Sequence, residues 1–218
     1  MNIRKHTTNN ENHCLLEETE MKQARVLTEK ELNLFLLYLS TKKHAARDRC
    51  MTLMSFQSGM RIGEIVATTV KDVLASDGSI RYEINLKAEQ TKGKFGRTVV
   101  LAEKLRKEIQ IYLQTRFKTK DLLALTTTEK YHKPLFATQK REGFDNNTAC
   151  YHFHMLYKAA GLSGASSHSG RRSFLTNLSA KAVPLKVLME LAGHRQAQTT
   201  MRYINVTSDM KRAAVELV

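Results

Sequence analysis

The chain has 218 residues, enough for one ordinary domain, and 42% of them are hydrophobic, which supplies a packed core and excludes wholesale disorder. Lysine and arginine number 35 against 21 acidic residues, so the net charge of +14 predicts a polyanionic partner, nucleic acid before a membrane surface. No apolar run is long enough for a transmembrane helix, and the first residues lack the apolar core of a secretion signal. Three scattered cysteines fit neither a disulfide framework nor a zinc knuckle. These features predict a cytoplasmic protein.

The chain is predicted to divide near residue 25. Residues 1–24 are polar and rich in asparagine, and they hold three basic residues against four acidic ones. The positive charge therefore belongs to residues 25–218, and the first segment is predicted to be a tail or a short leader helix.

Helical signals begin at Thr28, which forms a capping box with Glu31 ahead of the apolar residues at 32–39. A second helix is predicted over 45–57. It should end at Gly59, because glycine adopts the left-handed conformation of a helix C-cap.

A β-hairpin is predicted in the middle of the chain. After the Asp77-Gly78 turn signal, residues 80–86 alternate between apolar and polar, which is typical of a half-buried strand. Residues 90–96 contain two glycines and predict a turn, and 97–101 predict the returning strand.

The remaining chain is predicted to be helical apart from a short extended piece at 134–136. Asn146 or Asn147 should cap one helix, while Pro184 should begin another that ends at Gly193. The expected fold class is mainly α with a small antiparallel β-sheet (α+β). The helices are expected at 103–117, 146–160, 168–181, 184–192, around Tyr203, and at 210–218, the last with Thr207 or Asp209 as its cap.

Arg61 follows a glycine at the start of a short helical stretch. An arginine there offers a bidentate fork to a phosphate, aided by the unpaired backbone amides of the helix start. Taken alone, the spacing favours a surface arginine paired with Glu64.

His168 and Arg171 are three residues apart and would share one face of a helix. A histidine can move a proton near neutral pH, and an arginine holds an anion, which together suit phosphoryl chemistry. A solvated basic helix end explains the same pattern equally well.

His194 and Tyr203 form the third cluster, nine residues apart. A tyrosine hydroxyl becomes a useful nucleophile when positive charge surrounds its target and a base accepts its proton. On its own, such a tyrosine is more often a packed side chain.

Together and in this order, these residues resemble the catalytic domain of the tyrosine recombinase (phage integrase) family, from about residue 25 to the C-terminus. The resemblance rests on an arginine ahead of Gly63-Glu64, a lysine in Thr91-Lys92-Gly93, a His-x-x-Arg motif, a Gly-His pair and a following tyrosine. Ser169-Gly170 departs from the Asp-Leu that is common inside His-x-x-Arg. The implied catalytic residues are Arg61, Lys92, His168, Arg171, His194 and Tyr203.

The resemblance implies that Tyr203 attacks a scissile phosphodiester and becomes joined to the 3′-phosphate. Arg61 and Arg171 would hold the non-bridging oxygens. The phosphotyrosyl bond conserves the energy of the broken linkage, so neither a cofactor nor a metal is expected.

In the same implied mechanism Lys92 protonates the departing 5′-oxygen, with Lys94 as the alternative. His168 assists proton transfer and His194 donates to the phosphate. Arg172 is expected to contact backbone phosphate or to be solvated.

The implied activity is site-specific recombination or integration on double-stranded DNA, in a nucleoid-associated protein that self-associates on DNA as a synaptic tetramer. Residues 1–24 are too short for the family's N-terminal clamping domain, so the chain is similar to short fimbrial-inversion recombinases or to part of a mobile-element integrase. The alternatives are a DNA-binding regulator or accessory factor with the same fold, and a type IB topoisomerase-like enzyme. No membrane partner is expected.

Cys150, His152 and His154 resemble metal ligands at first sight. On a helix, however, residues two apart point to different sides, so the two histidines are not expected to share an ion. Residues 184–195 are similar to half of a helix-turn-helix, but their apolar residues, Val187 among them, favour core packing.

Overall fold

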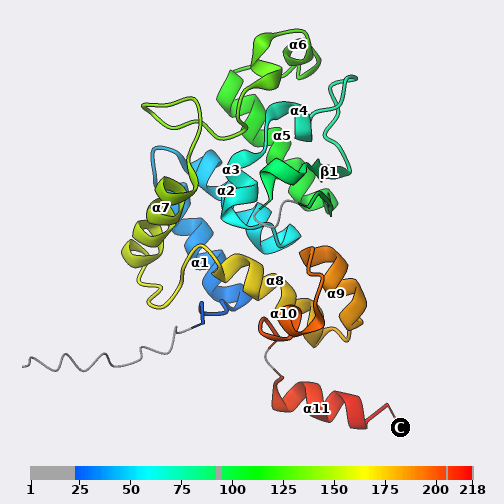
Figure 1. Cartoon of the computed structure of the whole chain (residues 1–218). Helices are drawn as coiled ribbons and strands as arrows, with labels where there is room; N and C mark the ends of the chain where they lie inside the picture. The colour runs from blue at the N-terminus through cyan, green and yellow to red at the C-terminus, as the bar shows by residue number, and fades with distance from the viewer. Residues whose placement is uncertain (1–22, 92–94, 205, 218) are drawn as a thin grey trace, which may run out of the picture.

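A computed structural model describes residues 23–91, 95–204 and 206–217 and confirms a mainly helical fold with a small antiparallel sheet (Figure 1). None of the helices in these ranges is both long and apolar enough to cross a membrane. The elements in chain order are α1 Glu29–Ser40, α2 Ala45–Ser58, α3 Ile62–Ala67, α4 Val70–Val73, β1 Glu83–Leu86, η1 Ala88–Gln90, β2 Arg97–Val100, α5 Glu103–Phe117, α6 Leu123–Thr126, η2 Glu129–His132, α7 Asn146–Ala159, α8 Ser169–Ala180, α9 Leu185–Ala192, α10 Ala197–Met201 and α11 Ser208–Val215.

Local capping interactions set several of the helix ends. The Thr28 capping box forms as predicted, and Gly59 and Gly193 end α2 and α9 with φ of 65° and 63°. The predicted cap of α7 is wrong, because Asp145 accepts the Thr148 amide at 2.8 Å and places the cap one residue earlier. A carboxylate is favoured there by the positive end of the helix dipole.

The hairpin is shorter than predicted. β1 and β2 pair in antiparallel register from Glu83↔Val100 to Leu86↔Arg97, and Ile84, Leu86 and Val99 are buried. Ile80 makes only an isolated bridge, with Leu74, so the strand predicted over 80–86 starts three residues late.

The main hydrophobic core lies around α2, which packs most extensively against α8 and α5. Gly170 allows the close approach of α8, because a Cβ added there would lie 2.5 Å from the Ser55 hydroxyl oxygen on α2. This approach brings the next residue, Arg171, against the end of α2 at Gly59.

A smaller apolar cluster joins α8 to the C-terminal helices. Leu175, Leu188 and Ala192 form its buried centre, and Tyr203 and Ile204 pack against it. Figure 1 shows α9 and α10 beside α8, with α11 beyond them at the bottom of the view. The core-packing prediction holds for Leu188 but is wrong for Val187, which is 44% exposed, as expected for the outer face of an amphipathic helix.

Candidate active site

Arg61 is the N-cap residue of α3 and forms two interactions with the buried Glu64. Its backbone amide donates to Glu64 Oε2 at 2.8 Å, and its Nη1 donates to Oε1 at 2.9 Å. One quarter of the Arg61 side chain remains exposed, and it lines a cavity. Arg61 can therefore stay paired with Glu64 and still contact an anion in the cavity.

Glu64 also binds a second arginine, Arg97, which begins β2. Nη2 and Nε of Arg97 donate to the two carboxylate oxygens at 2.7 and 3.3 Å, and Nη1 donates to the Leu191 carbonyl at 2.9 Å. Burial alone would raise the pKa of Glu64, but the hydrogen bonds and charges of Arg97 and Arg61 outweigh it and lower that pKa. The carboxylate is therefore ionised between two guanidinium groups.

Neither role follows from the sequence. There, Glu64 is the surface partner of Arg61 and part of the Gly63-Glu64 pair, and Arg97 is the first residue of the returning strand. The sequence signal for the role of Glu64 is its position three residues after Arg61. This N-cap and N3 spacing places the Glu64 carboxylate beside the helix start.

Arg171 is fully buried at the junction of three elements. Its Nη1 donates to the Gly59 carbonyl at 2.6 Å, and its Nη2 donates to the Ala192 carbonyl at 2.6 Å and to His194 Nε2 at 2.8 Å. Its buried Nε has no hydrogen-bond partner in the described part of the chain. Burial, followed by the nearby charge of Arg61, lowers the pKa of Arg171, and the two carbonyl acceptors stabilise its charged form.

His194 is neutral in this arrangement. Because a guanidinium only donates, Nε2 must accept from Arg171, and the ring proton lies on Nδ1, which faces the Thr200 hydroxyl at 2.9 Å. Burial, and then the charge of Arg171, lowers the pKa of His194 to about 4. Donation from Nε2 to a phosphate, the role implied by the resemblance, thus requires Arg171 to release that nitrogen.

We expect His194 to keep this neutral Nδ1–H form from pH 8 down to pH 5. A folded-state pKa below that of the unfolded chain gives a stabilisation that is complete above about pH 6.5 and decreases as the pH falls toward 4. Nitrogen-15 NMR of the imidazole reports the tautomer directly. A His194 midpoint near 6.5 would contradict the assignment.

Tyr203 lies two residues after α10, not within it as predicted. Its carbonyl accepts from the Thr176 hydroxyl at 2.7 Å. Its ring centroid is 5.3 Å from that of His194, and the Arg171 guanidinium carbon is 5.7 Å from the Tyr203 ring centroid. The structure therefore brings Arg171, His194 and Tyr203 into one cluster.

The remaining predicted residues belong to α8 or lie outside the described residues. His168 is the N-cap residue of α8 and is exposed, one turn before Arg171. Lys92 and its alternative Lys94 lie outside the described residues, although Thr91 and Phe95 on either side line the cavity. The prediction of a solvated Arg172 is wrong, because that residue is only 8% exposed.

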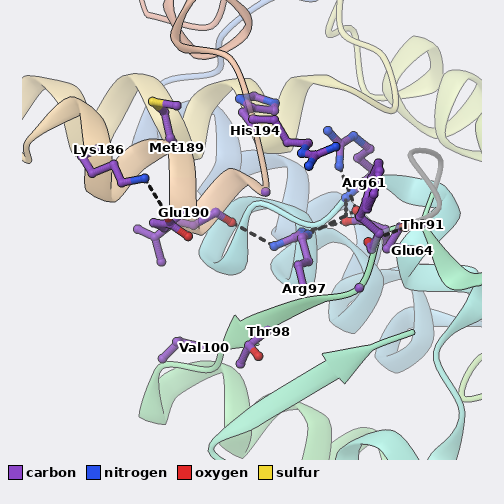
Figure 2. Close-up of a pocket in the computed structure, with 15 residues that line it drawn as sticks. Arg61, Glu64, Thr91, Arg97, Thr98, Val100, Lys186, Met189, Glu190 and His194 are labelled. Carbon is purple, nitrogen blue, oxygen red and sulfur yellow. Dashed lines mark hydrogen bonds and ion pairs between the residues drawn. The ribbon is translucent and has the colours of Figure 1, made fainter. Parts of the chain in front are cut away.

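A cavity of about 920 Å³ lies between β2 and α9 (Figure 2). Figure 2 shows Arg61, Arg97 and Glu64 turned toward one another, with His194 nearby and Lys186 paired to Glu190 at the other side. Arg195 also lines the cavity, so four permanent cations face two carboxylates. This excess of positive charge suits an anionic ligand.

The histidines of α7 belong to a different arrangement. His152 contacts the buried Asp48 at 2.9 Å, and the same carboxylate oxygen accepts from Arg47 at 2.9 Å. Within residues 23–91, 95–204 and 206–217, no group of three or more potential ligands could hold a metal ion.

Comparisons with known proteins agree with this architecture. The chain is 28% identical over 173 residues to "Tyrosine recombinase XerC" of Chlamydia pneumoniae, a match that covers 79% of this chain and 51% of the relative. A crystal structure of XerA recombinase aligns with a TM-score of 0.68 at 23% identity, over 88% of this chain and 64% of the other. The Tn1549 transposon integrase in complex with transposon right end DNA aligns with a TM-score of 0.66 at 20% identity, over 92% and 68%.

The chain spans about half the length of that curated relative, and the structural likenesses show a shared fold. The sequence profile described as "Phage integrase family" matches residues 25–210, which is most of the chain. The chain therefore belongs to the phage integrase family.

Proposed function

We propose that residues 25–218 form a catalytic domain that cleaves and rejoins DNA at specific sites through a 3′-phosphotyrosyl intermediate, with residues 1–24 as a tail. The observation that carries this proposal is the convergence of Arg61, Arg171, His194 and Tyr203. They come from separate parts of the sequence: Arg61 and His194 line one basic cavity, and Arg171 and the Tyr203 ring lie beside His194.

In the proposed reaction the Tyr203 hydroxyl attacks the phosphorus and the bond to the 5′-oxygen breaks. Arg61 and Arg171 stabilise the negative charge on the non-bridging oxygens, a task that needs fixed donors in a water-poor site. His168 accepts the tyrosine proton and Lys92 delivers a proton to the departing oxygen. His194 donates from Nε2 to the phosphate after Arg171 has turned toward that phosphate and the ring proton has moved from Nδ1 to Nε2, with Nδ1 then accepting from the Thr200 hydroxyl.

Double-stranded DNA is the proposed substrate. The proposed active assembly is a tetramer of this chain formed on two DNA sites. The protein is proposed to be associated with the nucleoid. The basic cavity and the net charge of +14 support the polyanionic substrate. The DNA named in the Tn1549 integrase structure, which shares this fold, supports DNA as the polyanion.

The direct test is covalent capture. Preferred duplexes are first selected from a random library by binding, then remade with a nick beside each candidate cleavage position so that religation fails. We expect a protein–DNA adduct on a denaturing gel, with and without EDTA, because arginines replace a metal ion. Binding without an adduct would favour the regulator, and loss in EDTA restored by magnesium would favour a metal nuclease.

DNA affinity is expected to fall steeply with salt. A protein that neutralises six to ten phosphates loses about 10³–10⁵ in affinity between 50 and 200 mM salt, because counterions are released on binding. Fluorescence anisotropy titrations at several salt concentrations measure the slope. A flat dependence would contradict a polyanionic substrate.

A further inference from the structure

Arg97 connects three elements that carry the proposed phosphate site. It begins β2, it binds Glu64 on α3 through two nitrogens, and it binds the Leu191 carbonyl in the last turn of α9. Only 8% of its side chain is exposed, although it belongs to the hairpin and to none of the motifs. Arg97 lines the cavity, but its guanidinium donates to Glu64 and to the Leu191 carbonyl, so it acts on the carboxylate that Arg61 binds.

We infer that Arg97 is a positioning residue for strand cleavage. Its guanidinium neutralises the Glu64 carboxylate, and the positive charge of Arg61 therefore stays available to the scissile phosphate. This inference rests on the proposed function and assigns a role to a residue outside the six catalytic positions.

The shared carboxylate shows why one arginine depends on the other. Oε1 of Glu64 accepts from Arg61 Nη1 at 2.9 Å and from Arg97 Nε at 3.3 Å, while Oε2 accepts from Arg97 Nη2 at 2.7 Å. Two cations and one buried anion leave a net charge of one positive. Without Arg97, Glu64 would cancel the charge of Arg61, and the phosphate would meet a neutral pair.

The guanidinium group of Arg97 supplies directed hydrogen bonds in addition to its charge. Only a guanidinium fork reaches both oxygens of Glu64 and a carbonyl in another direction. The path of the side chain also requires Gly193, because a Cβ at that position would collide with Cδ of Arg97. Since Gly193 directly precedes His194, the same contact fixes strand β2 against the segment that carries the histidine.

Removing the charge of Arg97 and then that of Glu64 distinguishes this role from simple packing. Arg97→Met keeps a stem of similar shape and removes the charge, and it should slow adduct formation at saturating DNA by about 100-fold. Adding Glu64→Gln removes the carboxylate that cancels the charge of Arg61 and should restore the rate by about tenfold. Glu64→Gln alone should lower the rate, because Arg61 and Arg97 then lose the carboxylate that orients both. A double variant no faster than Arg97→Met would overturn the inference.

Two further variants complete the test. Arg49→Met is the matched control, because Arg49 makes a similar two-bond pair with Glu108 away from the cavity, and its rate should be unchanged. If Arg97→Met fails to fold, the Arg97→Lys variant tests the role of Arg97 instead. The retained charge predicts a rate within about tenfold of the native protein, and a loss as large as 100-fold in the folded lysine variant would overturn the inference.

The adduct assay distinguishes a failure of the proposed function from a failure of the role of Arg97. A native protein that forms no tyrosyl adduct on any selected duplex would reject the recombinase proposal itself. A native protein that forms the adduct, together with an Arg97→Met variant that Glu64→Gln does not accelerate, would reject only the role of Arg97.

Discussion

Tyr203→Phe is expected to abolish covalent attachment to DNA while leaving DNA affinity nearly unchanged. The phenylalanine ring keeps the contacts with His194 and Arg171 and removes only the hydroxyl that attacks the phosphate. Because no second nucleophile is proposed in the cluster, the loss should exceed about 10⁴-fold. The nicked substrate and a denaturing gel measure the adduct, and anisotropy measures the affinity.

Tyr151→Phe is the matched control for this change. Tyr151 is 66% exposed on α7 and outside the cluster, so its substitution should leave the adduct intact. An adduct that persists in Tyr203→Phe would assign the nucleophile to another tyrosine.

Lys92→Ala is expected to lose most activity on ordinary DNA and to recover it on DNA whose 5′-bridging oxygen is sulfur. An alkoxide leaves poorly without a proton, whereas a thiolate leaves unaided because the pKa of a thiol is far lower. Arg61→Ala should show no such recovery, because its proposed partner is a non-bridging oxygen. The rates of both variants on the two substrates give the comparison.

Other outcomes of the sulfur experiment would reassign the proton donor. Equal recovery of Lys92→Ala and Arg61→Ala would show that the effect is not specific to a general acid. Recovery of Lys94→Ala in place of Lys92→Ala would move the role two residues along the sequence.

Features that depend on neighbours in sequence were predictable. The capping box at Thr28 and the left-handed glycines at 59 and 193 are local devices, and each ends or begins a helix where expected. The prediction at Asn146 failed by one residue because several polar residues can cap a helix, and tertiary context selects among them. The family resemblance, not periodicity, predicted which distant residues would share a site.

Features that depend on burial could not be predicted in the same way. The sequence shows an arginine three residues before a glutamate, a pattern that usually describes a solvated surface pair. The structure buries Glu64 and adds Arg97 from a strand more than thirty residues away, which changes a weak pair into a three-residue charge cluster. Arg172 became buried for a related reason, since α8 packs closely against α2.

Tyr203 also marks a boundary in local stability. Before it, α8 and α9 share buried apolar side chains, whereas α11 after it buries none. Amide hydrogens of α8 should therefore exchange through rare openings close to the free energy of global unfolding, while those of α11 exchange through frequent fraying. The Tyr203 amide donates to the Thr200 carbonyl at 2.9 Å, and its carbonyl accepts from the Thr176 hydroxyl. Its ring packs on the small cluster and not on the main core, so it can leave Arg171 without disturbing the main core. Exposing the Tyr203 hydroxyl would therefore disrupt only the structure around Tyr203.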